Sequence, residues 1–314
     1  MMSSATVAQS VLDAAGPQAA AIEWLWWVIF AIAVVVFAAT MGMLAAAVVR
    51  RNTRLSSERV MTRWVVAASG ATVVILFGWL VASVSVGRVT AAPQMSDAVT
   101  INVTGRQWWW QAEYVDTLPS NRFKTANEIL IPVGRPVVLN VTSRDVIHSF
   151  WVPNLHGKRD LVPGYVTSLW FQADREGVYR GQCAEFCGYQ HANMAVFVRA
   201  VPESDFQSWL VSQRQPAPDP TTELHARGRD VFLRATCSQC HTIRGTRAGG
   251  AYGPDLTHIG SRATIAAGAL PNTSENLQRW IRNPHDFKPG NKMPPHDLND
   301  RDLRAVAEYL GSLK

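Results

Sequence analysis

The four cysteines of this 314-residue chain are the residues most able to carry chemistry, and they form two close pairs. The first pair is Cys183 and Cys187, and the second is Cys237 and Cys240. In an oxidising compartment the default expectation for such pairs is structural disulfides. Each pair, however, has other metal-binding side chains beside it, so the neighbouring residues decide between a structural and a chemical role.

The second pair is followed at once by His241, in the pattern Cys-Ser-Gln-Cys-His. This spacing is the attachment pattern of a c-type haem, in which the thiols bind the macrocycle and the histidine binds the iron. Met293, the only methionine after His241, stands on a proline-rich segment and is the expected sixth ligand. The alternative sixth ligands are His258, His285 and His296. A thioredoxin-like thiol pair is the competing interpretation, but no strand–helix–strand pattern surrounds the motif.

The first pair opens a short segment, residues 183–194, that also contains Glu185, His191 and Met194, and His148 lies upstream of it. Two thiolates, two imidazoles and a thioether are the soft ligands that copper selects. One copper ion needs only one thiolate, whereas two thiolates can bridge two copper ions with little change of geometry on reduction. The pattern therefore predicts a dinuclear copper site for electron transfer, with a disulfide or a single-copper site as alternatives.

The copper motif lies in a region that the sequence predicts to be β structure. Short runs rich in β-branched and aromatic residues alternate with Gly, Pro, Asp and Asn turns, which indicates an antiparallel sandwich or barrel. These runs are residues 99–104, 128–133, 136–142, 165–173 and 194–201. A helix is predicted to start at Pro202, with Ser204 or Asp205 near its cap, and to run to residue 213, and the proline-rich residues 214–222 predict an extended linker.

The haem motif lies in a region of helical patterns beyond that linker. The expected helices cover residues 223–234, 273–282 and 299–313, with Thr273 or Ser274 capping the second. The C-terminal part is therefore expected to be a separate, all-helical domain.

Two segments without ionisable side chains, Trp24–Val49 and Trp64–Gly87, precede both regions. Each is long enough to cross a bilayer, which takes about 20 apolar residues. The loop between them carries five arginines against the single acid Glu58, so the positive-inside rule places it in the cytoplasm. Both termini and the large C-terminal part are then extracytoplasmic, at the plasma (inner) membrane of a bacterium. A signal peptide is not expected, because no basic residue precedes the first apolar run and that run is too long.

Composition excludes several classes of protein. Charged residues are 17% of the chain and hydrophobic residues 47%, against about 25% charged in ordinary soluble domains. A purely cytosolic or a disordered protein is therefore ruled out. The net charge of +6 is spread out, without the basic cluster and interleaved aromatics that indicate nucleic-acid binding.

Residues 223–314 resemble class I cytochromes c. The resemblance rests on the haem motif, Gly-Pro-Asp-Leu at 253–256, Trp280 and Lys-Met-Pro-Pro at 292–295. It implies that Pro254 packs beside His241 and that one covalent haem c is held by Cys237, Cys240, His241 and Met293.

Nearly the whole chain resembles subunit II of cytochrome c oxidase, through the helical hairpin, a cupredoxin-like barrel and residues 147–164 and 177–194. The resemblance implies a copper A site in which Cys183 and Cys187 bridge two copper ions and His148 and His191 each bind one of them. The weak axial ligands that it implies are Met194 and the backbone carbonyl of Glu185. It also implies that the Glu185 side chain reaches a magnesium ion at the interface with subunit I.

Two further residues are singled out by the same resemblance. Trp108 follows Gly105-Arg-Gln, where the family has Gly-His-Gln, and matches the tryptophan through which electrons enter; packing in the core is the alternative. Glu58 is near the position where many relatives carry a glutamate at the mouth of a proton channel, although alignment on Trp64 puts Met61 there. Glu58 either lies at the entrance of a proton channel or offsets part of the positive charge of the arginine-rich loop.

The sequence as a whole predicts a multidomain membrane protein, subunit II of a haem–copper oxidase with a fused cytochrome c. The expected parts are an N-terminal segment (1–23), two transmembrane helices (24–87), a cupredoxin-like domain (88–213), a linker (214–222) and a cytochrome c domain (223–314). Electrons are expected to pass from an external cytochrome c or a quinol-oxidising complex to haem c and copper A.

The expected acceptor is subunit I, where haem a and copper B reduce oxygen to water with proton translocation. Subunit III and membrane lipid are further expected partners. The chain would thus be part of an oxidoreductase whose oxygen site lies in another subunit. Copper chaperones and thiol-redox proteins of oxidase assembly are the alternative, although they need neither His191 and Met194 nor a haem domain. A nitrous-oxide reductase would require a large propeller domain.

Overall fold

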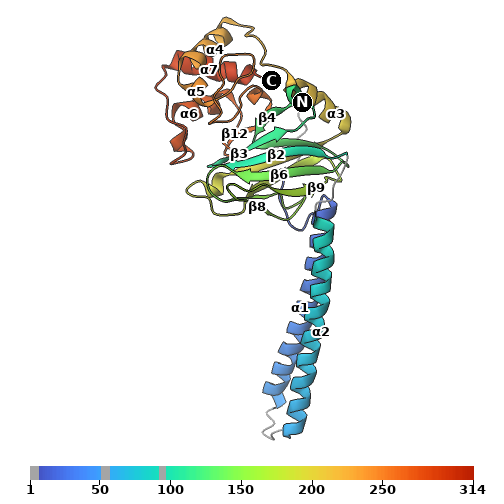
Figure 1. The fold of residues 1–314 in the computed structure, drawn as a ribbon. Coiled ribbons are helices and arrows are strands. Elements are labelled where there is room, and N and C mark those ends of the chain that lie inside the picture. The colour runs from blue at the N-terminus through green and yellow to red at the C-terminus, as the bar shows by residue number, and fades with distance from the viewer. Residues whose placement is uncertain (1–6, 51–56, 92–96) are drawn as a thin grey trace.

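The computed structural model describes residues 7–50, 57–91 and 97–314, and it has three parts (Figure 1). A long helical hairpin projects from one end of a β domain, and a helical domain packs against the β domain away from that hairpin. The chain runs through these parts in order, from the blue hairpin through the green and yellow strands to the orange and red helices.

The hairpin consists of α1 (Pro17–Arg50) and α2 (Glu58–Thr90). Their apolar stretches have mean hydropathies of 2.6 and 2.2 and are long enough to cross a membrane. Both helices extend beyond the apolar segments, because the flanking residues include good helix formers such as alanine and glutamate. Residues 51–56 of the arginine-rich loop lie outside the described part of the chain. Glu58 is the first residue of α2, at the end of the hairpin far from the β domain (Figure 1).

The β domain is a sandwich of two sheets. One sheet has the order β5 (Glu128–Pro132), β11 (Ala195–Val201), β10 (Gly177–Cys183), β7 (His148–Trp151), β8 (Arg159–Leu161). The other has the order β4 (Phe123–Ala126), β3 (Trp109–Tyr114), β2 (Val99–Arg106), β6 (Val137–Ser143), β9 (Thr167–Phe171). Burial alternates residue by residue along β6, as expected for a strand with one face on the core. Trp110 and Phe150 meet edge to face in that core, with ring centroids 5.5 Å apart.

The N-terminal segment packs on the β domain before the hairpin begins. Its short strand β1 (Val7–Ala8) pairs in parallel with β10. Further along, Asn154 donates a side-chain hydrogen bond of 2.8 Å to the carbonyl of Asp13. The start of α1 and the end of α2 are therefore at the same end of the hairpin, next to the β domain.

Helix α3 (Glu203–Arg214) follows the last strand and closes one end of the sandwich, where Trp209 meets Tyr114 with ring centroids 5.0 Å apart. The predicted linker comes next. Its Ala217 backbone N–H donates to the carbonyl of Arg244 over 2.9 Å, so the linker lies against the helical domain.

The helical domain contains α4 (Glu223–Arg234), α5 (Cys237–Cys240), α6 (Ser274–Arg282) and α7 (Asp300–Ser312). Helices α4 and α7 cross at Gly228, where an added Cβ would be 2.0 Å from the carbonyl oxygen of Ala305, so only glycine fits. Thr273 caps α6 by accepting a hydrogen bond from the N–H of Asn276, as predicted. The short elements are η1 (Pro119–Asn121), η2 (His191–Asn193), η3 (Ile259–Ser261), η4 (Pro284–Asp286), β12 (Thr264–Ile265) and β13 (Leu270–Pro271).

The helical domain docks on the β domain through its residues 263–268. The buried carboxylate of Glu128 accepts hydrogen bonds from the N–H groups of Ala263 and Thr264 at 3.2 and 2.8 Å. The N–H of Ala195 donates to the carbonyl of Ala267 over 3.1 Å. These contacts give the two domains a fixed relative position in addition to the covalent linker.

Candidate copper and haem sites

The first cysteine pair lies where β10 ends and a short loop begins. Cys183 is the last residue of β10, which pairs with β7, and His148 is the first residue of β7. The Sγ atoms of Cys183 and Cys187 are 3.7 Å apart, and Nδ1 of His148 is 3.8 Å from Sγ of Cys183. Ligand atoms of these three buried residues lie within 4.8 Å of one another, close enough to hold a metal ion.

The other predicted copper donors surround the same two sulfur atoms. Nδ1 of His191 is 3.6 Å and Sδ of Met194 is 3.9 Å from Sγ of Cys187. The carbonyl oxygen of Glu185 is 3.2 Å from Sγ of Cys183. The fold thus brings all six predicted donors together. Both cysteines are free thiols, and their sulfur atoms are well beyond the roughly 2.05 Å of a disulfide.

Asp145 orients the histidine on the β7 side of this cluster. Its Oδ1 lies 2.8 Å from Nε2 of His148, so Nδ1 is the nitrogen that faces the cysteines. Burial opposes the charged forms, but hydrogen bonding between the two raises the pKa of His148 and lowers the pKa of Asp145 to about 2. Such carboxylate–histidine pairs fix the orientation of metal-bound imidazoles.

The two thiols interact strongly with each other. Their mutual hydrogen bond lowers the pKa of Cys183 and raises the pKa of Cys187, so without metal one thiolate forms well before the second. Binding of metal to both sulfurs therefore releases a proton. The soft, buried donor set fits copper.

The predicted haem-binding residues lie around α5 and the loop before α7. Cys237 and Cys240 are the ends of α5, and His241 follows directly. Nδ1 of His241 is 2.8 Å from the carbonyl oxygen of Pro254, which leaves Nε2 free to bind iron. An added Cβ at Gly253 would be 2.5 Å from the His241 ring, so a glycine is required beside the imidazole. Burial lowers the pKa of His241 and keeps the ring neutral, as ligation requires.

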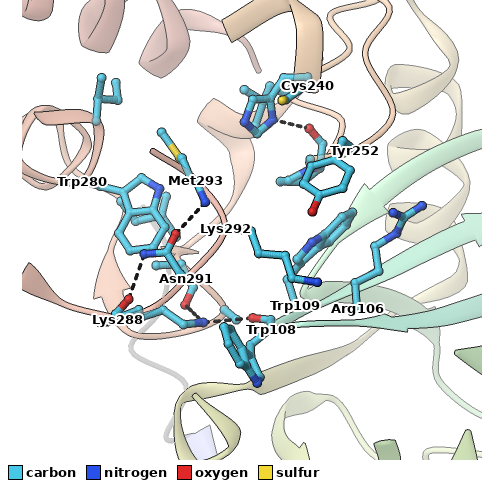
Figure 2. A pocket seen from close by; sticks show the side chains of 18 of the residues that line it. Arg106, Trp108, Trp109, Cys240, Tyr252, Trp280, Lys288, Asn291, Lys292 and Met293 are labelled. Atoms are coloured by element: carbon cyan, nitrogen blue, oxygen red, sulfur yellow. Dashed lines mark hydrogen bonds between the residues drawn. The ribbon is translucent and has the colours of Figure 1, made fainter. Parts of the chain in front are cut away.

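A cavity of about 520 Å³ connects these residues and has a largely apolar lining. Figure 2 shows Cys240 and Met293 facing the cavity from the helical domain, with Trp108 and Trp109 on the side of the β domain. Its size is within the range of cofactor pockets, and the donors on its walls fit a covalently bound haem.

Three histidines were candidates for the sixth iron ligand besides Met293. His296 lines the cavity, as do Cys237 and His241. His258 bonds to the carbonyl of Gln215, and His285 accepts a hydrogen bond from the N–H of Gly290. Neither of these two side chains lines the cavity, which leaves Met293 and His296 beside it.

Trp108 lies between the two candidate sites. Its side chain is only 7% exposed, and its Nε1 donates a hydrogen bond of 2.9 Å to the carbonyl of Cys187. Trp110 is wholly buried in the sandwich core, as the packing interpretation expects, while Trp109 faces the haem cavity. Trp108 is therefore positioned against the copper ligands on one side and the haem cavity on the other.

The sequence did not point to several residues at these sites. Asp145 lies three positions before His148, a spacing that could have suggested a carboxylate partner for the imidazole. Lys288, 3% exposed, donates to carbonyls of both domains, and burial lowers its pKa to about 7. Nothing in its local sequence marks it. Glu128 likewise looked like an ordinary strand residue.

Two sequence families match the chain. Residues 99–201 match "Cytochrome C oxidase subunit II, periplasmic domain", and residues 225–314 match "Cytochrome c". The cytochrome c oxidase subunit 2 of Alkalihalophilus pseudofirmus is 42% identical over 224 residues, 71% of this chain and 64% of that protein. The subunit 2 of Bacillus subtilis is 31% identical over 69% of this chain and 63% of that protein.

The chain thus spans somewhat less than two thirds of the length of these relatives. Among solved structures, the periplasmic domain of subunit II of cytochrome oxidase from Bradyrhizobium japonicum is 33% identical, covering 38% of this chain and 96% of that domain, with a TM-score of 0.35. The predicted fold class is confirmed: two apolar helices, a cupredoxin-like β domain and a helical cytochrome c domain. The chain therefore joins a periplasmic domain of the cytochrome c oxidase subunit II family to a cytochrome c domain.

Proposed function

We propose that the chain is subunit II of a respiratory haem–copper cytochrome c oxidase and carries electrons from a covalent haem c to a dinuclear copper A centre. One observation carries this proposal. The predicted copper donors gather around two sulfur atoms 3.7 Å apart, and Trp108, bonded to the Cys187 carbonyl, also lines the cavity of the haem ligands. When bound, the two groups supply redox centres that change oxidation state one electron at a time.

The roles of the side chains follow from their positions. Cys183 and Cys187 would hold the copper ions through their sulfur atoms, together with His148 and His191, whose Nδ1 atoms lie beside those sulfurs. Met194 and the carbonyl of Glu185 would supply the weaker donors. In the haem domain Cys237 and Cys240 would hold the haem covalently, and His241 and Met293 would bind its iron.

The remaining partners belong to the proposal as well. The acceptor is subunit I with haem a and copper B, where oxygen is reduced and protons are translocated, and subunit III completes the assembly. The donor is an external cytochrome c or a quinol-oxidising complex. Glu185 also reaches a magnesium ion shared with subunit I, Trp108 admits electrons to copper A, and Glu58 admits protons.

The proposed location is a bacterial plasma membrane, with α1 and α2 crossing the bilayer and both termini on the outer side. The pairing of β1 with β10 supports this topology, because it keeps the N-terminal segment beside the β domain. The arginines of the predicted loop, among them Arg59 and Arg63 on α2, then face the cytoplasm.

Metal analysis and electron paramagnetic resonance of the detergent-solubilised full chain test the proposal. The expected result is two coppers and one haem per chain, a mixed-valence copper signal, and a low-spin haem spectrum that changes in Met293→Ala. One copper, or a dithiol without copper, would favour a copper chaperone or thiol-redox protein of oxidase assembly instead. Tyr165→Ala, an exposed change far from the predicted ligands in sequence, is the control.

A further inference from the structure

The loop that carries Met293 is tied to Lys288 within the helical domain. The carbonyl of Lys288 accepts a 2.8 Å hydrogen bond from Nδ2 of Asn291, whose Oδ1 accepts a 2.8 Å bond from the N–H of Met293 (Figure 2). The position of the predicted haem ligand therefore depends on the position of residue 288.

The side chain of Lys288 leaves this loop and reaches the β domain. Its Nζ donates to the carbonyl of Trp108 over 2.9 Å and to the carbonyl of Ala266 over 3.2 Å, so one ammonium group joins both domains (Figure 2). From Trp108 the contacts continue, since the indole Nε1 donates to the carbonyl of Cys187. A continuous series of hydrogen bonds thus runs from Met293 to a predicted copper ligand.

Two neighbours of Lys288 support the same contact. Gln190, which directly precedes His191, donates from Nε2 to the carbonyl of Pro289 over 2.7 Å. Nζ of Lys292 is 3.7 Å from Oδ2 of Asp145, the carboxylate that holds His148. The loop 288–293 therefore touches residues next to both predicted copper histidines.

A buried lysine is a costly way to join two surfaces. At 3% exposure its ammonium loses most of its hydration, which is tolerated only where hydrogen bonds replace the water. An apolar side chain could fill the same space without that cost. What the ammonium adds is direction, because its donors fix Trp108 and Ala266 at defined places relative to each other.

We propose that Lys288 is a positioning residue that holds the Met293 loop against Trp108 and so fixes the haem relative to the copper site. The inference rests on the proposed function and adds to it. A linker alone would raise the effective concentration of one domain near the other and leave their distance variable. A fixed contact holds the two domains at one distance and orientation, so electron transfer does not wait for them to meet.

The test compares the full chain with its Lys288→Met variant, both loaded with haem and copper. Hydrogen exchange is measured for residues 105–110 and 263–268, and haem-to-copper transfer is followed after rapid reduction of the haem. The variant is expected to exchange faster in both segments and to transfer on the order of tenfold more slowly, with a rate that now depends on solvent viscosity. The haem and copper spectra should stay unchanged. Lys124→Met, at an exposed lysine of β4, is the matched control.

Wild-type exchange together with a wild-type transfer rate in Lys288→Met would overturn the inference. Should that variant fail to accumulate, Lys288→Gln replaces it, because the shorter neutral amide cannot form both hydrogen bonds. Faster hydrogen exchange and slower haem-to-copper transfer are expected in that variant too. A wild-type chain that binds both groups without transfer between them would overturn the proposed function. Hydrogen exchange in the variant would then still decide whether the docking depends on Lys288.

Discussion

The copper site and the haem site bind their groups in different ways. At the copper site the predicted donors already touch one another at the end of β10, beside a core of apolar side chains. At the haem site the ligands lie around a cavity of about 520 Å³ between the helical domain and the β domain. The β fold alone thus gathers the copper donors, whereas the haem would fill a space that the two domains enclose together.

The largest expected effect is that of removing the haem. In the double variant Cys237→Ala/Cys240→Ala the haem is no longer attached, and its cavity of about 520 Å³ between the two domains would be left without it. Without the haem the apolar walls of this cavity lose their packing partner, so the helical domain should lose stability. Hydrogen exchange should therefore be faster in residues 223–314 than in the wild type, with strands β2 to β11 still protected. A haem-free helical domain as protected as the wild type would break the comparison.

The next effect concerns the pH dependence of copper binding. The hydrogen bond between the two thiols raises the pKa of Cys187. The hydrogen bonds of His148 with Asp145 and Cys183 raise the pKa of that histidine. Both side chains therefore lose a proton when metal binds. Copper affinity should rise with pH by about tenfold per pH unit for each proton released, until those groups are deprotonated in the free protein. Competition with a chelator at a series of pH values measures this slope, with the covalent haem band as internal control. An affinity that is independent of pH would mean that both thiolates are formed before metal arrives.

A smaller effect is expected from Asp145→Asn. The amide cannot accept a charge-assisted hydrogen bond at Nε2 of His148, so the imidazole is less well oriented, and copper affinity should fall by about 10- to 100-fold. Chelator competition measures the affinity, and the haem spectrum should not change. Asp97→Asn, at a carboxylate whose side chain is 88% exposed, is the matched control. Equal affinities in Asp145→Asn and the control would show that the β strands alone orient the ligand.

The smallest effect is expected at the interface between the β domain and the helical domain. Glu128→Gln replaces a buried carboxylate that accepts from the N–H groups of Ala263 and Thr264. The amide of glutamine keeps one acceptor oxygen, so docking should weaken only by the difference between a charged and a neutral hydrogen bond, about 1 kcal/mol. Faster hydrogen exchange of residues 263–268 without a change in either spectrum is the expected readout. Glu176→Gln, at an exposed glutamate, is the control, and equal exchange in both variants would contradict this role of Glu128.

Much of the architecture could be predicted because it depends on local signals. The apolar segments mark the hairpin by composition alone, and the alternating runs mark the strands. The ligands of both sites stand in two short motifs, with only His148 and Met293 at a distance. Local spacing is sufficient where the chemistry itself demands neighbouring residues, as it does for two bridging thiols.

The rest depends on contacts between segments far apart in the sequence. Glu128 meets Thr264, and Lys288 meets Trp108, across separations of 136 and 180 residues. A buried glutamate or lysine has no periodicity or motif that distinguishes it from an exposed one. The pairing of β1 with β10 escaped prediction for a similar reason, since a two-residue strand is too short to show alternation. Such contacts set the relation between the two sites.

Electron transfer from haem c to copper within one chain is the central property proposed for this protein. The direct measurement is to reduce haem c rapidly in the solubilised full chain and to follow the copper absorption at several protein concentrations. Transfer at a first-order rate that does not change with concentration is the predicted result, because Trp108 lies between the two sites of the same molecule. Copper reduction at a rate proportional to protein concentration, or none at all, would contradict the account.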